Sequence, residues 1–206
     1  MSGLQHRLLV QGLRFGFRER WLFSDWNTEL APGLHWLRGT NGSGKSSLLR
    51  LLAGVLEPAR GQREIDGLCA RRQALAYRRE LFWVGPERLG FDHLSSLEFF
   101  AFLTGLYPRW SAARLAEARA GLHLDEAVCA QRLAALSSGT QRKVWLAVGL
   151  AAGTALLLLD EPWNALDADS ATWLYGCAER RDGRIWLVAS HQAPCATPDS
   201  VLDLSA

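Results

Sequence analysis

A glycine-rich loop near residue 40 constrains the fold of this chain more than any other feature. The segment Gly39 to Ser46 fits the pattern G-x-x-x-x-G-K-[ST] between an apolar strand candidate, Leu34 to Leu37, and a helix candidate starting near Ser46. Such glycines let backbone N–H groups turn inward around an anion, and the helix directs its positive N-terminal end there. A chance glycine-rich turn is the alternative, which the flanking strand and amphipathic helix disfavour. We predict a phosphate-binding loop in which Lys45, exposed on the loop, holds the β- and γ-phosphates of a nucleotide, and the Ser46 hydroxyl holds Mg²⁺.

A second segment places two carboxylates at the end of a strand. The apolar run Leu156 to Leu159 is followed by Asp160 and Glu161, a pattern typical of a buried parallel strand. Open α/β sheets bind their ligands at this end of the strands. We therefore expect Asp160 to hold Mg²⁺, directly or through water, and Glu161 to polarise the water that attacks the γ-phosphate. Acids that merely cap the next turn, helped by Pro162, are the alternative, which the loop upstream makes less favourable.

A third segment is the polar turn Leu136 to Lys143, which leads into a helix predicted over Val144 to Ala152. Ser137 or Ser138 can cap this helix, whose N-terminus would then form a second anion site. An ordinary capped helix gives the same pattern, and the residues alone favour that simpler interpretation.

Together, the three segments resemble the motifs of the ATP-binding subunit of an ABC transporter. Gly39 to Ser46 is similar to the Walker A motif of that family, Leu136 to Lys143 to its signature motif, and Leu156 to Glu161 to its Walker B motif. Ala165 to Asp167 is similar to the D-loop, and His191 to the switch histidine. The resemblance covers nearly the whole chain in the right order, and the signature separates this family from kinases and GTPases.

The resemblance implies a set of site residues and the cofactors ATP and Mg²⁺. It implies catalytic roles for Glu161 and His191, and metal ligation by Ser46 and Asp160, with Glu87 as a further candidate. It places an aromatic that stacks on adenine at Phe17. The residues implied to contact nucleotide are Phe17, Gly39, Asn41, Gly42, Ser43, Gly44, Lys45, Ser46, Ser47, Ser137, Gly139 and Asp167.

Three positions depart from the family pattern. Ser138 stands where the signature usually has Gly, and Thr140 where it often has Gln, but Ser137 and Gly139 are in place, so activity is still expected. Glu87 occupies the position of the Gln loop. Because like charges raise each other's cost of ionisation, Glu87 either ligates Mg²⁺ directly or turns to the permease-facing surface, where the neighbouring Arg88 offers a charge partner. We favour the second arrangement.

Composition agrees with one globular domain spanning residues 1–206, since the chain is 49% hydrophobic and 21% charged. A net charge of only +2 implies no strong attraction to nucleic acid. The four cysteines lack metal-ligand spacing, which suits reduced thiols in the cytosol. No targeting segment is visible, and no apolar stretch approaches the roughly 18 residues needed to cross a bilayer. A transport path would therefore need another polypeptide.

The predicted fold class is α/β, a P-loop NTPase whose RecA-like core is a parallel sheet flanked by helices. An N-terminal antiparallel β subdomain begins with short strands at 8–10 and 26–30. A helical subdomain at about 88–143, with helices over 96–106 and 111–121, carries the signature. Further strands are predicted at 185–189 and 201–204.

The resemblance implies an ATP-binding and hydrolysing subunit that energises a separate transmembrane permease at the cytoplasmic face of the cell membrane. Two copies, or this chain and a paralogous ATPase, would pair head to tail, so that each signature completes the other subunit's ATP site. The segment Val84 to Pro108 resembles ATPases of ABC-2-type exporters, and Ser190-His191-Gln192 is similar to the haem-exporter ATPases of cytochrome c maturation. Cargo and direction stay open.

Two other functions are considered. A soluble ABC-type ATPase acting on DNA or ribosomes usually has two nucleotide domains or a coiled-coil insert, neither of which is present here. A nucleotide-binding regulator without turnover is disfavoured because Lys45, Asp160, Glu161 and His191 are all intact.

Overall fold

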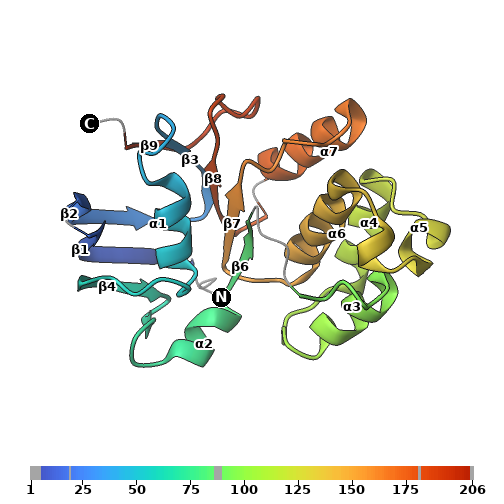
Figure 1. Cartoon of the computed structure of the whole chain (residues 1–206), viewed down its shortest axis with the longest axis horizontal. Coiled ribbons are helices and arrows are strands. Elements are labelled where there is room, and N and C mark those ends of the chain that lie inside the picture. The colour runs from blue at the N-terminus through green and yellow to red at the C-terminus, as the bar shows by residue number, and fades with distance from the viewer. Residues whose placement is uncertain (1–5, 19, 86–89, 181, 205–206) are drawn as a thin grey trace, which may run out of the picture.

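The computed structural model describes residues 6–18, 20–85, 90–180 and 182–204. An antiparallel sheet, a parallel sheet and a group of helices lie side by side, in that order from left to right in Figure 1. The predicted fold class is confirmed: this is the layered arrangement of a P-loop NTPase with an additional β subdomain and a helical region.

The antiparallel sheet has four strands in the order β2-β1-β4-β5. Their bounds are β1 Leu8–Phe17, β2 Arg20–Leu30, β4 Arg60–Ile65 and β5 Leu68–Cys69. β1 and β2 are longer than predicted. Exposed polar residues such as Gln11 interrupt the apolar run from which the strands are predicted, although buried residues such as Leu13 continue the strand beyond it. The pairing register of β1 shifts between Val10 and Leu13, around Gly12 with its φ of 60°.

The parallel sheet has five strands in the order β6-β7-β8-β3-β9. Their bounds are β3 Gly33–Arg38, β6 Leu81–Val84, β7 Leu156–Asp160, β8 Ile185–Ala189 and β9 Ser200–Asp203. Every residue of β7 and β8 is buried, as their continuous apolar runs predict for strands covered on both faces. All the strands point the same way, so the segments that follow β3, β6, β7 and β8 emerge at one edge of the sheet.

Helices flank this sheet. Their bounds are α1 Lys45–Leu52, α2 Ala74–Arg79, α3 Ser96–Thr104, α4 Ala112–Gly121, α5 Glu126–Ala130, α6 Ser138–Ala151 and α7 Ala168–Glu179, with a 3-10 turn at Leu133–Ala135. α3 begins with a capping box between Ser95 and Glu98, and α6 begins six residues before the predicted Val144. Among the described residues no helix is both long and apolar enough to cross a membrane.

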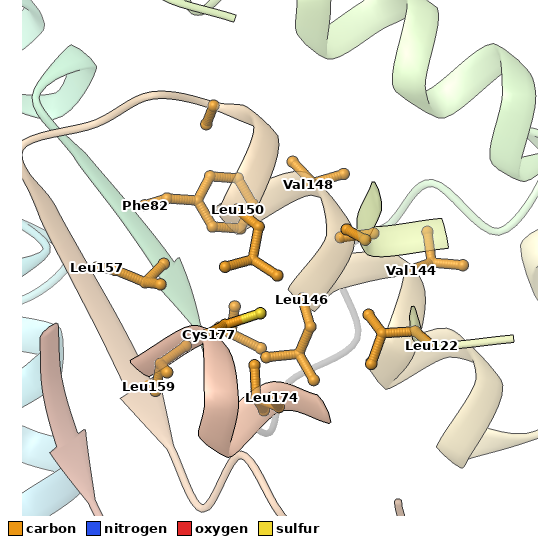
Figure 2. Close-up of a cluster of buried hydrophobic side chains, with 14 of the residues drawn as sticks. Phe82, Leu122, Val144, Leu146, Val148, Leu150, Leu157, Leu159, Leu174 and Cys177 are labelled. Atoms are coloured by element: carbon orange, nitrogen blue, oxygen red, sulfur yellow. The ribbon is translucent and has the colours of Figure 1, made fainter. Parts of the chain in front are cut away.

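Two hydrophobic clusters hold the layers together, one on each face of the parallel sheet. Leu157 and Leu159 of β7 pack with residues of α6 and α7, as Figure 2 shows, and Ala118 of α4 belongs to the same cluster. The alternate residues Leu156 and Leu158 face the other cluster, which α1 shares with the antiparallel sheet. Close packing on both faces therefore restricts the movement of the parallel sheet and of its carboxyl edge.

Candidate functional site

The loop between β3 and α1 has the conformation that an anion site requires. Gly42 and Gly44 have φ values of 78° and 103°, a backbone region that residues with a Cβ rarely adopt. Gly44 is the N-cap of α1, and no side chain of the described residues caps that helix. The first N–H groups of α1 are thus left for a ligand, as predicted for a phosphate-binding loop.

Lys45 is the first residue of α1, and its placement differs from the exposed loop lysine expected from the sequence. The residue is buried, with 8% exposure, because its side chain folds back beneath the loop. Its Nζ donates hydrogen bonds to the carbonyl oxygens of Gly39 at 2.7 Å and Thr40 at 3.1 Å. The ammonium group therefore stabilises the curved loop as well as offering a charge for phosphates.

Asp160 ends β7 beside this loop and is almost fully buried. Burial raises the pKa of its carboxyl group, while a hydrogen bond with the Ser46 side chain and the charge of Arg142 oppose that rise. One carboxylate oxygen, Oδ2, has no hydrogen-bond partner among the described residues. The structure thus brings together the two predicted metal ligands, Ser46 and Asp160, and supplies oxygen atoms of the kind that Mg²⁺ prefers.

Glu161 follows directly and has a strained backbone, with a φ of 48° that is uncommon for a residue with a side chain. Its Oε1 is buried and accepts no hydrogen bond from the described residues, although His191 Nε2 lies 3.4 Å away. The two predicted catalytic residues are therefore neighbours, and a carboxylate oxygen is left without a donor at the carboxyl edge of the sheet.

These residues share one pocket of about 410 Å³. It is lined by Phe17, Arg20, Leu22, Thr40, Asn41, Gly42, Gly44, Lys45, Ser46, Ser47, Asp160, Glu161 and His191. A larger hollow of about 1150 Å³ lies on the antiparallel sheet around Arg60 and Arg72, but it contains none of the predicted catalytic residues. The chemistry of the lining, and not the volume, identifies the smaller pocket as the candidate site.

Five predicted nucleotide contacts do not line this pocket: Gly39 and Ser43 of the glycine-rich loop itself, and Ser137, Gly139 and Asp167 of a different part of the chain. Ser137 caps α6 by accepting a hydrogen bond from the N–H of Thr140 at 3.1 Å. A Cβ at Gly139 would lie 2.6 Å from the carbonyl oxygen of Ala165, so the signature turn touches the D-loop. These residues form a separate polar edge where α6 and α7 begin.

Asp167 joins this edge as the N-cap of α7. Its carboxylate accepts hydrogen bonds from the backbone and hydroxyl of Ser170, and it forms an ion pair with Lys143. Lys143 and these hydrogen bonds hold the pKa of Asp167 well below its usual range. Glu87 and Arg88 lie outside the described residues, so both arrangements considered for Glu87 stay predictions.

Arg142 is a residue of the site region that the sequence did not single out. From α6 its Nη1 donates to the carbonyl oxygen of Gly85 at 3.0 Å, and its Nη2 donates to those of Asp160 at 2.6 Å and Glu161 at 2.7 Å. Burial lowers the pKa of the guanidinium, and the charges of Asp160 and Glu161 oppose that effect. The only sequence signal was a basic residue within the signature segment, four positions after Ser138.

Comparisons with known proteins identify the family of this chain. The family described as ABC transporter matches residues 23–164, more than half of the chain. The cytochrome c biogenesis ATP-binding export protein CcmA of Cupriavidus pinatubonensis is 38% identical over 167 residues, which are 79% of this chain and 73% of that protein.

Two solved structures have the same fold. The ATP-binding subunit of an ABC transporter has a TM-score of 0.80 and 23% identity, covering 89% of this chain and 79% of that one. The dimeric, post-hydrolysis state of an ATP-binding cassette bound to ADP and Pi has a TM-score of 0.74 and 22% identity, covering 90% of this chain and 88% of that one. With its phosphate-binding loop, its pair of carboxylates at the sheet edge and its family match, this chain belongs to the ABC transporter family as an ATP-binding and ATP-hydrolysing subunit.

Proposed function

We propose that the chain hydrolyses ATP in the pocket between the Gly39–Ser46 loop and Glu161, and that this reaction drives a separate transmembrane permease. The proposal rests on Glu161, which lines the same pocket as the glycine-rich loop and His191, and whose buried Oε1 has no hydrogen-bond donor among the described residues. An unsatisfied carboxylate oxygen of this kind is costly in a folded protein, and a water molecule at the γ-phosphate would supply its donor.

The lining residues fit an ATP molecule from one end to the other. Phe17 lines the pocket at the end of β1 and is 54% exposed, so its ring is accessible for stacking on adenine. The N–H groups of Gly42 and Gly44 and the ammonium of Lys45 surround the phosphates. Ser46 and Asp160 would hold Mg²⁺, which supplies charge neutralisation for the phosphates when it is bound.

Hydrolysis then depends on Glu161 and His191. Glu161 orients the attacking water and accepts its proton, while His191 stabilises the arrangement from its exposed position beside the carboxylate. Glu161 follows the buried strand β7 directly, and His191 lies two residues after the buried strand β8.

The site of one subunit is incomplete, because the signature residues lie on a different edge. Ser137 and Gly139 cannot reach the pocket of their own chain, whose lining excludes them. A second copy bound head to tail would bring its Ser137 hydroxyl and Gly139 N–H to the γ-phosphate as donors. The dimeric cassette with the same fold supports this arrangement, and a paralogous ATPase could take the place of the second copy.

The name of the CcmA relative supports an exporter and a role in cytochrome c biogenesis for this chain as well. The permease would hold the protein at the cytoplasmic face of the membrane. No nucleic acid is expected as a partner, since the net charge is only +2.

A test of this function uses Glu161→Gln, which removes the base and leaves the phosphate loop intact. With Mg-ATP this variant should elute at twice the monomer mass of 22.8 kDa in size-exclusion chromatography with light scattering. The double variant Lys45→Ala/Glu161→Gln is the control and should remain monomeric. Monomeric Glu161→Gln at saturating ATP, also in the presence of the permease, would contradict the dimer.

A second test separates transport from the soluble alternative. The protein should fractionate with membranes when a candidate multi-span permease is co-expressed, and not in a strain without candidate permeases. Equal distribution in both strains would favour a soluble ATPase that acts on nucleic acid or ribosomes.

A further inference from the structure

Arg142 connects the signature helix to the strand that carries the catalytic acid. It lies on α6, four residues after Ser138, and therefore one turn below the signature motif on the same face of the helix. Its side chain leaves the helical region and ends at the carboxyl edge of the parallel sheet, where it is partly buried. It does not line the ATP pocket, so it has no contact with substrate.

The guanidinium binds two strand ends at once. One nitrogen donates to the carbonyl oxygen of Gly85, the residue after β6, at 3.0 Å. The other donates to the carbonyl oxygens of Asp160 and Glu161 at 2.6 Å and 2.7 Å. Only a planar, forked cation can donate in these directions from one position, which distinguishes arginine from lysine here.

These bonds fix the peptide groups on both sides of Glu161. The Glu161 N–H donates to the carbonyl oxygen of Ala189 on β8 at 2.8 Å, and Arg142 binds the Glu161 carbonyl oxygen. Between these two anchors the backbone of Glu161 has the strained φ of 48°. A strained conformation persists only where the surroundings hold it in place. On the C-terminal side of Glu161, Arg142 does this together with the Asn164 N–H, which donates to the same carbonyl oxygen at 3.2 Å.

We infer that Arg142 is a positioning residue for ATP hydrolysis, which holds the Glu161 carboxylate at the γ-phosphate and links its orientation to the signature helix. The inference rests on the proposed function, in which Glu161 is the base. In the proposed dimer, the signature motif at the start of α6 contacts the ATP bound to the partner subunit. Arg142 therefore couples a movement of α6 to the position of Glu161 in the same subunit.

The test compares Arg142→Lys and Arg142→Gln with the wild type. Both variants should bind ATP with a Kd and a KM within about threefold of wild type, since no pocket contact changes, but kcat should fall by roughly 10- to 100-fold because the acid is misplaced. Arg142→Lys keeps the positive charge and the aliphatic part of the side chain, so this variant alone is used for the test if Arg142→Gln does not fold.

Arg184→Lys is the matched control. Arg184 is buried more deeply than Arg142, and it donates to the carbonyl oxygens of Gly149 and Leu150 at the other end of α6, next to the start of β8. Arg184→Lys should lower the unfolding temperature about as much as Arg142→Lys does, and it should leave kcat within about twofold of wild type. An equal loss of kcat in Arg184→Lys would show that any weakening of α6 suffices, and would overturn the inference.

A double-mutant cycle with Glu161→Gln decides whether Arg142 acts through Glu161. If it does, Arg142→Lys should change the residual single-turnover rate of Glu161→Gln by less than about twofold. Full additivity, or a kcat of Arg142→Lys equal to wild type, overturns the inference while the proposed function stands. A wild type without turnover, or a Glu161→Gln variant as active as wild type, would instead refute the proposed function.

Discussion

Replacing Lys45 with Met should destabilise the protein even without nucleotide, because Lys45 supports its own loop. The change removes the two hydrogen bonds to Gly39 and Thr40 and leaves the volume of the buried stem almost unchanged. Hydrogen bonds from a charged group contribute about 1.5–3 kcal/mol, and we expect a loss in that range for the whole ammonium group. For a chain of this size, 1 kcal/mol corresponds to about 2–4 °C, so the unfolding temperature should fall by about 3–12 °C.

The assay is thermal unfolding with and without Mg-ATP. Wild type should gain about 2.7 kcal/mol of stability at an ATP concentration of 100 times Kd, whereas Lys45→Met should gain much less, because its phosphate contact is lost. Arg72→Met is the control, since the Arg72 side chain is 74% exposed and its ion pair with Glu64 is long at 3.8 Å, so the change should alter stability by under about 1 kcal/mol. An unchanged unfolding temperature together with a normal response to ATP would refute both roles of Lys45.

Three further predictions concern other parts of the structure. Phe17→Ala should weaken ATP binding about 5- to 150-fold in calorimetry by removing the stacking surface for adenine, and an unchanged Kd would exclude that contact. Gly139→Ala should cost about 1–3 kcal/mol in thermal unfolding, because the added Cβ would lie 2.6 Å from the Ala165 carbonyl oxygen; the exposed neighbour variant Ser138→Ala should cost little, and equal values would refute the contact. Burial lowers the pKa of His35 below its usual 6.5, so protonation opposes folding and stability should be lost as the pH falls from about 7 to 5. His35→Gln should flatten that decline in urea titrations, and the prediction fails if the two slopes are the same.

The sequence identified the parts of the site that depend on local pattern. The loop from Gly39 to Ser46 was predictable because the positive φ values at Gly42 and Gly44 require glycine. β7 was predictable because a strand covered on both faces is apolar throughout, and its acids must then appear at the end.

The sequence was less informative where the structure depends on contacts between distant residues. The hydrogen bond from Arg142 to Gly85 spans 57 positions, and no local pattern marks it. The burial of Lys45 results from the way its side chain folds back on the loop, which composition does not reveal. In β1 the half-exposed face interrupts the apolar run, so the sequence predicts a strand only over Leu8 to Val10.

Single-turnover hydrolysis of ATP tests the central claim most directly, with wild type and Glu161→Gln measured in parallel at saturating Mg-ATP. ATP binding, measured on the same samples, should agree within a few-fold, because Lys45 and the phosphate loop are unchanged. Phosphate release should be slower in Glu161→Gln by about 100-fold or more, the contribution of a positioned general base. Equal rates of phosphate release in the two proteins would contradict the assignment of this pocket as the catalytic site.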